Sequence, residues 1–62
     1  MKAEFDNAYI KVWFSTQSTS RNFYNVTEII MQENVVLIKT KEGHQNLLNL
    51  NNVTLIEEIE KR

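Results

Sequence analysis

The sequence predicts an all-β fold of five strands, arranged as a small barrel or a strongly bent antiparallel sheet, with one short helical turn before the last strand. From Val26 to Ile59, short apolar segments rich in β-branched residues alternate with short polar breaks. The only glycine, Gly43, lies between two such segments, where it can supply the positive φ of a tight hairpin. Almost nothing in this region has a helical period.

The first strand is expected at residues 8–15, where apolar and polar side chains alternate. One face then carries Ile10, Val12 and Phe14, expected in the core, and the other carries Tyr9, Lys11 and Trp13. The polar segment 15–22 follows and predicts a long surface loop.

Three more strands are expected at residues 23–31, 35–39 and 45–50. The break at 32–34 contains Asn34, a residue type that tolerates the left-handed conformation of a short turn. The strand 35–39 begins with four successive apolar residues, so it must be covered on both faces or lie in an interface.

A final strand is expected through Ile59, with a tight helical turn near Val53. A short terminal helix is the alternative, because Val53, Ile56 and Glu60 are spaced like one helix face. The strand is preferred because β-branched residues dominate this segment.

Length and composition restrict the function classes. A chain of 62 residues predicts one small β domain, residues 1–62, with a thin core that favours support from self-association. The chain has no cysteine, and His44 alone cannot build a metal site, so neither a cofactor nor a metal is expected. The net charge of −1 argues against a strongly electrostatic partner. The absence of a signal-like or membrane-spanning apolar run predicts a cytoplasmic protein that does not bind membranes.

An enzyme is not expected. Most carboxylates lie beside turns, at the ends of the chain or on an acidic tail, and none is placed in the sheltered environment that acid–base chemistry needs. Glu28 is the exception in position, but alternation turns it to solvent. His44 lies in a turn, and nothing in the sequence orients it toward Ser15, Ser18 or Ser20 as a catalytic triad would require.

The strongest binding candidates are aromatic residues with interleaved cations, namely Tyr9, Lys11, Trp13, Tyr24 and Lys39. Such a set suits a protein interface, where tryptophan and tyrosine dominate the binding energy. It also suits single-stranded nucleic acid, whose bases stack on rings while lysine meets phosphate. A third interpretation is structural: Trp13 completes the small core, and Ile10 or Val12 faces out.

The central strands carry more apolar side chains than one thin core can hide. Val35, Leu37 and Leu47 are therefore predicted to form an oligomer interface. A homodimer or larger homo-oligomer would also shield open sheet edges that no proline guards.

The order of strands and breaks resembles the SH3-like and Sm-like small barrels. Residues 33–39, 43–45 and 53–56 are similar to the second half of bacterial Sm-like RNA chaperones. That resemblance implies a ring assembly and an RNA site, whereas the chain lacks the N-terminal helix and the glycine of the second strand in that pattern.

The expected function is therefore non-catalytic: a small interaction protein, homo-oligomeric, which binds through surface complementarity. The alternative is an RNA- or single-stranded-DNA-binding module that uses the aromatic and lysine face. A third possibility is a small regulator of one protein target. Brevity and composition are typical of bacterial, phage or other mobile-element proteins.

Overall fold

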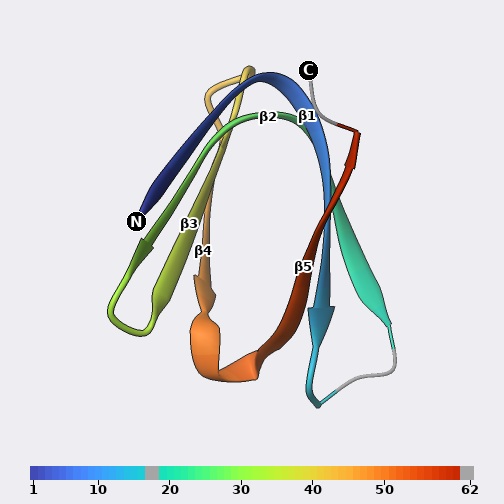
Figure 1. Ribbon diagram of the computed structural model, residues 1–62, viewed down its shortest axis with the longest axis vertical. Helices are drawn as coiled ribbons and strands as arrows, with labels where there is room; N and C mark the ends of the chain where they lie inside the picture. Colours follow the sequence, from blue (N-terminus) through green and yellow to red (C-terminus); the bar gives the residue numbers. More distant parts are fainter. Residues whose placement is uncertain (17–18, 61–62) are drawn as a thin grey trace.

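The computed structural model describes residues 1–16 and 19–60, and in this part of the chain five strands form one antiparallel sheet (Figure 1). The elements are β1 (Lys2–Phe14), β2 (Ser20–Gln32), β3 (Val35–Thr40), β4 (Gln45–Asn49), the 3₁₀ turn η1 (Leu50–Asn52) and β5 (Val53–Glu60). Their order across the sheet is β4-β3-β2-β1-β5. The predicted fold class is confirmed as an open, strongly bent all-β sheet with one helical turn before the last strand.

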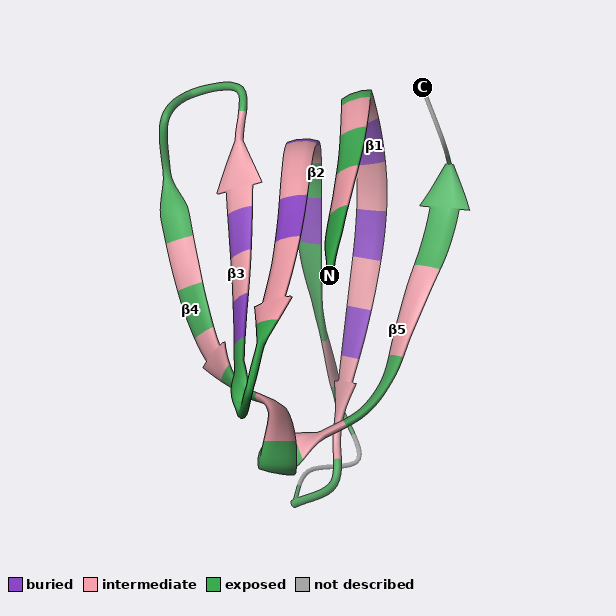
Figure 2. Ribbon diagram, turned by 60° about the vertical axis from the view of Figure 1, so that its left-hand side comes forward, coloured by how far each residue is buried: buried purple, intermediate pink, exposed green. Residues whose placement is uncertain are grey.

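The bend comes from the two long strands, β1 and β2, which arch together over one end of the molecule (Figure 1). Their pairing shifts register between Glu4 and Ala8 and again before Ile10, and Asn25 opposite this region has a φ of 57°. Such bulges bend a strand and increase its twist. The bent sheet wraps around its own apolar face but does not close, so β4 and β5 remain as its two edges (Figure 2).

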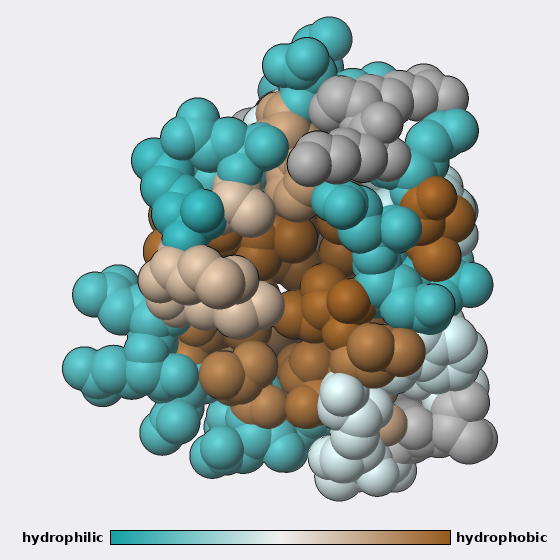
Figure 3. Space-filling view, in the orientation of Figure 1, coloured by the Kyte–Doolittle hydropathy of each residue, from teal (hydrophilic) through white to brown (hydrophobic). Residues whose placement is uncertain are grey.

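The core lies on the concave face of the sheet and follows the alternation of β1, β2 and β3. Its buried members are Ala8, Ile10, Val12, Phe23, Val26, Ile29, Val36 and Ile38. Phe14 packs against this cluster while staying partly exposed. Figure 2 shows the buried positions as bands separated by less buried ones, and Figure 3 shows apolar side chains gathered at the centre with hydrophilic ones around them.

Two predicted strand limits were wrong. β1 begins at Lys2 instead of residue 8, because Lys2 pairs with Ile30 and Ala3 with Ile29 along β2. β2 begins at Ser20, which pairs with Trp13, so the predicted loop 15–22 was too long at its C-terminal end. Residues 17 and 18 of that loop lie outside the described residues.

The turns follow the predictions in part. Gly43 has a φ of +94°, which confirms the expected glycine hairpin between β3 and β4. In the turn between β2 and β3 the residue with positive φ is Glu33, at 55°, and not Asn34 as expected. The helical turn is η1, which ends at Asn52, just before the position expected.

The C-terminal segment is the strand β5 as far as Glu60, so the alternative of a terminal helix was wrong. In the described part of the chain, no helix is long and apolar enough to cross a membrane.

Candidate functional site

The structure brings four of the predicted binding residues together on the convex face of β1 and β2. They are Tyr9, Lys11, Trp13 and Tyr24, named here the aromatic cluster. The rings of Tyr9 and Tyr24 stack with centroids 4.7 Å apart and an angle of 22° between their planes. The Lys11 ammonium lies 5.7 Å from the centre of the Trp13 ring. Alternation predicted that Tyr9, Lys11 and Trp13 face away from the core, and the burial of Ile10 and Val12 confirms it.

A hydrogen bond positions Tyr9 of the stacked pair. The Tyr9 hydroxyl donates to Oδ1 of Asn22 over 3.2 Å. Its hydrogen bond with Tyr24 raises the pKa of the Tyr24 phenol, as does the charge of a Tyr9 phenolate, while Lys11 acts in the opposite direction. Tyr24 remains 57% exposed, so one side of this stack is open to a partner.

Trp13 is half-buried on the convex face, which leaves it neither in the core nor fully in solvent. Its indole N–H donates a 2.6 Å hydrogen bond to Oε1 of Glu57, on the neighbouring strand β5. In the antiparallel pairing of β1 with β5, Glu57 is also the residue directly opposite Lys11. The cationic and aromatic groups at this end of the cluster therefore face a carboxylate of the same chain.

Lys39, the fifth predicted binding residue, lies elsewhere on the convex face. Its ammonium is 3.4 Å from Oε1 of Glu28, and Lys2 approaches the other oxygen of the same carboxylate at 2.9 Å. The hydrogen bond from Lys2, the hydrogen bond from Lys39 and both positive charges hold the pKa of Glu28 below its usual range. Glu28 is on the outward face, as alternation predicted, but its side chain is only 18% exposed because it is held between two lysines.

A second surface lies on the convex face of β2, β3 and β4 and is apolar. Ile30 pairs with Leu37, and Leu37 pairs with Leu47, so these three side chains form one row across adjacent strands. Val35 adjoins the row on β3. We call Ile30, Val35, Leu37 and Leu47 the apolar face. It contains all three residues of the predicted oligomer interface.

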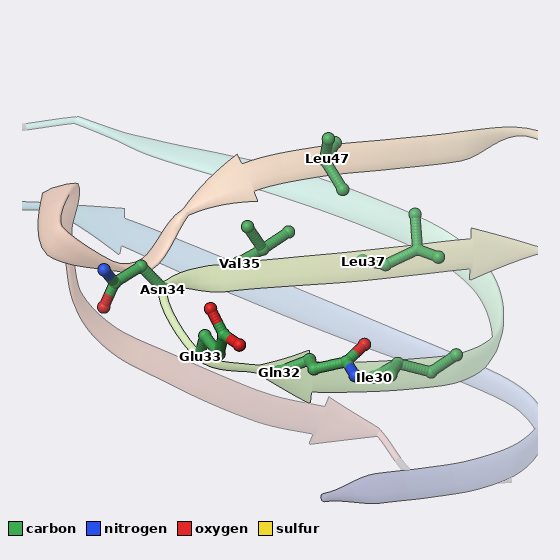
Figure 4. Close-up of a pocket in the computed structure, with 7 residues that line it drawn as sticks. All are labelled: Ile30, Gln32, Glu33, Asn34, Val35, Leu37 and Leu47. Carbon is green, nitrogen blue, oxygen red and sulfur yellow. The ribbon is translucent and has the colours of Figure 1, made fainter.

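The apolar face borders a groove of about 480 Å³, completed by Gln32, Glu33 and Asn34 (Figure 4). Leu47 is 69% exposed and Val35 38%, so the apolar side chains here are accessible and not part of the core. Figure 4 shows that the lining residues come from β2, the turn that follows it, β3 and β4. The next row across the same three strands is polar and consists of Glu28, Lys39 and Gln45.

Two residues of these surfaces were not predicted from the sequence. Ile30 was not assigned to the apolar face, although Ile29 and Ile30 are adjacent and alternation sends one of them outward. Glu57 was treated as part of an acidic tail, and only the pairing of β5 with β1 brings it to Trp13.

The described residues show little that resembles a catalytic or metal site. His44 is exposed in its turn, where its main-chain N–H donates to the Thr40 hydroxyl. Neighbouring Glu42 has a lowered pKa, since its own backbone N–H, Asn25, Thr40 and the charge of His44 favour the carboxylate. No group of three or more His, Cys, Asp or Glu side chains able to hold a metal occurs among these residues, and Ser18 lies outside them.

The chain was compared with known proteins at three levels. No family model, no curated protein and no solved structure matches it. The aromatic cluster and the apolar face are therefore the two candidate functional surfaces of the chain.

Proposed function

We propose that this chain is a non-catalytic interaction protein that forms homo-oligomers through the apolar face. The observation that carries the proposal is the cross-strand row of Ile30, Leu37 and Leu47, which is turned away from the core and ends at a side chain that is 69% exposed. Apolar side chains grouped on an accessible surface mark sites of protein association. A chain of 62 residues also has little core of its own, so burial of a second apolar surface adds stability that it needs.

The proposal includes an SH3-like or Sm-like barrel as the scaffold. What supports it is the path of the chain: β1 to β4 follow one another across the sheet, and β5 returns after a 3₁₀ turn to pair with β1. In this scaffold the convex faces of the two halves of the bent sheet point in different directions. The aromatic cluster would then stay accessible for a protein partner while Leu47, at the end of the apolar face, contacts the second copy.

The second candidate is a single-stranded nucleic-acid-binding module that uses the aromatic cluster. The exposed ring of Tyr24 and the Lys11 ammonium near Trp13 favour it. Two features disfavour nucleic-acid binding: Lys39 is paired with Glu28, and the carboxylate of Glu57 lies beside Trp13. Both reduce the positive potential that phosphates require. We rank it below self-association.

Light scattering coupled to size exclusion, run at low and high salt, tests the proposal. We expect an oligomer that persists at high salt, since apolar association is little screened by ions. Leu47→Glu should dissociate it. Leu55→Glu is the matched control, because Leu55 is a half-exposed leucine on β5, outside the apolar face.

A mixed oligonucleotide pool added to the same runs separates the two candidates. An oligomer that ignores the pool supports the interaction protein. A wild-type monomer that shifts with the pool only at low salt would refute the proposal and favour the nucleic-acid module.

A further inference from the structure

The free edge of β4 exposes one particular set of main-chain groups. At one end of the β3–β4 ladder the Thr40 N–H donates to the His44 carbonyl over 3.0 Å, and beyond the other end the Leu50 N–H donates to the Asn34 carbonyl over 2.7 Å. Hydrogen-bonded and non-hydrogen-bonded pairs alternate in an antiparallel ladder, and the register between these ends has no shift. The residues of β4 whose N–H and C=O groups point away from β3 are then Gln45, Leu47 and Asn49.

We infer that two copies of this chain pair antiparallel along their β4 edges, with Leu47 of one copy opposite Leu47 of the other on a two-fold axis. In that register Gln45 of each copy lies opposite Asn49 of the partner copy. Every outward N–H of β4 then meets an outward C=O, because all three pairs are of the hydrogen-bonded type. A shift of one residue would bring outward groups against groups already bonded to β3. This inference rests on the self-association proposed above and specifies its geometry.

The side chains of the same three residues agree with this register. They lie on the convex face, where Leu47 ends the row that begins at Ile30. Two-fold pairing joins that row to its copy through a Leu47–Leu47 contact, so a continuous apolar strip crosses both molecules and covers the most exposed apolar side chain of β4. On each side of this contact, the amide of Gln45 meets the amide of Asn49, and amides can both donate and accept.

The distribution of charged residues indicates that β4, and not β5, is the edge strand that pairs with a second copy of the chain. β5 carries Glu57, Glu58 and Glu60, and pairing two copies of it would place carboxylates near one another. β4 has the sequence QNLLN, with no charge, and its pairing with β3 has no bulge. Edge strands that do not pair with another chain usually carry charged residues, proline or a β-bulge that prevents the pairing, and β4 has none of these features.

The edge is also open to a second strand. Two hollows, of about 370 and 300 Å³, lie beside Leu47, Leu48 and Asn49. The first also reaches Asn34 and Val35, and the second is bounded on its other side by Phe14, Thr16 and Arg21 of the same chain. Gln45, Leu47 and Asn49 are all exposed. In the sheet of the described residues no strand lies beyond β4.

Single-cysteine variants test the register directly, because the natural chain has no cysteine that could react in their place. Leu47→Cys should form a disulfide-linked dimer under mild oxidation, since hydrogen-bonded pairs have Cα atoms about 5.5 Å apart, within disulfide reach. Gln45→Cys and Asn49→Cys should each fail alone, because equal positions then lie about 13 Å apart along the strands. The two variants should cross-link when they are mixed in equal amounts, left to exchange subunits and then oxidised. Random exchange places about half of the chains in mixed dimers, so up to about half of the chains should be cross-linked.

Two further variants separate the geometry from the association itself. Leu47→Lys should raise the dimer dissociation constant at least about tenfold, since two like charges would meet on the axis. Leu55→Cys, on the other edge strand, should give no cross-link.

The outcomes distinguish the two proposals. Cross-linking of Leu47→Cys together with the mixed pair supports β4 pairing. A wild-type monomer at all concentrations would refute both this inference and the proposed self-association. An oligomer that Leu47→Glu dissociates, but in which the mixed pair cross-links no better than either variant alone, would leave the self-association standing and overturn β4 pairing. An assembly larger than a dimer in which Leu55→Cys cross-links to Gln45→Cys would overturn it in favour of β4 meeting β5.

Discussion

The indole N–H of Trp13 donates a 2.6 Å hydrogen bond to Oε1 of Glu57, which joins β1 to β5 across 44 positions of sequence. β5 is an edge strand, so in the described sheet β1 is its only strand neighbour. The bond fixes the only tryptophan of the chain against the convex face and gives the last strand a side-chain attachment besides its main-chain ladder.

Removal of the Glu57 carboxylate should destabilise the fold. We expect Glu57→Ala to lower the free energy of unfolding by about 1 kcal/mol, because a half-buried indole N–H loses a charged acceptor. Urea unfolding followed by Trp13 fluorescence measures this. Glu58→Ala is the matched control, since Glu58 is an exposed neighbour on the same strand. Equal losses in the two variants would show that the bond adds nothing.

The hydrogen bond between Tyr9 and Tyr24 should be visible in an alkaline titration. The chain has two tyrosines, and the pKa of Tyr24 is raised above the ordinary value of 10.0 mainly by its hydrogen bond with Tyr9. Tyr9→Phe removes that partner, so the pKa of Tyr24 should return toward 10.0. Ultraviolet absorbance of the phenolate, measured for Tyr9→Phe and for Tyr24→Phe, separates the two groups. A Tyr24 titration that is the same with and without the Tyr9 hydroxyl would contradict the hydrogen bond between the two tyrosines.

Glu28 should contribute to acid sensitivity. Its pKa lies below the ordinary value of 4.5 in the folded chain, so the unfolded chain takes up its proton first as the pH falls. The stabilisation is therefore complete above about pH 4.5 and is lost as the pH falls through the lower native pKa. In Glu28→Gln the urea midpoint should vary less with pH over this range. Glu4→Gln, whose side chain is 73% exposed and 3.7 Å from Lys2, is the control and should retain the wild-type slope.

The two hairpin turns should respond in opposite directions to changes at their positive-φ residues. Gly43→Ala should cost about 1–2 kcal/mol of unfolding free energy, purely from the backbone, because a Cβ at this position meets nothing within 4 Å. Glu33→Gly should stabilise by about 0.5–1 kcal/mol, because Glu33 holds a φ of 55° that glycine adopts without strain. Thermal and urea unfolding of both variants give the signs. A destabilised Glu33→Gly would mean that the glutamate side chain supports the turn.

The alternation of apolar and polar residues was enough to predict most of the sheet. It located the buried side of β1 from Ile10 and Val12, and it showed that β3, with four apolar residues in succession, must have an apolar outer face. The N-terminal part of β1 was missed because Ala3 and Phe5 alternate with charged residues of low strand propensity. Pairing with β2 and the ion pair of Lys2 with Glu28 favour the strand there, and neither is visible locally.

The candidate surfaces were predictable to a similar extent. The two-residue alternation of strand side chains placed Tyr9 and Trp13 on one face of the sheet, and the apolar residues Val35, Leu37 and Leu47 were predicted as one interface. It could not show that the sheet bends between these groups, because the bend depends on register shifts and on a positive φ at Asn25. Nor does periodicity reveal cross-strand partners, so the approach of Glu57 to Trp13 required the pairing of the first strand with the last.

The return of β5 to β1 also determines when the fold can form during synthesis. Of the five strands of this sheet β1 is synthesised first, yet its residues Lys11 and Val12 pair with Glu57 and Ile56 of β5, which is synthesised after the other four. A nascent chain that ends at η1 can build the hairpins of β1 to β4, but it leaves the β1 edge unpaired and the core open on that side. Folding of this sheet is therefore expected to finish only after β5 has cleared the exit tunnel.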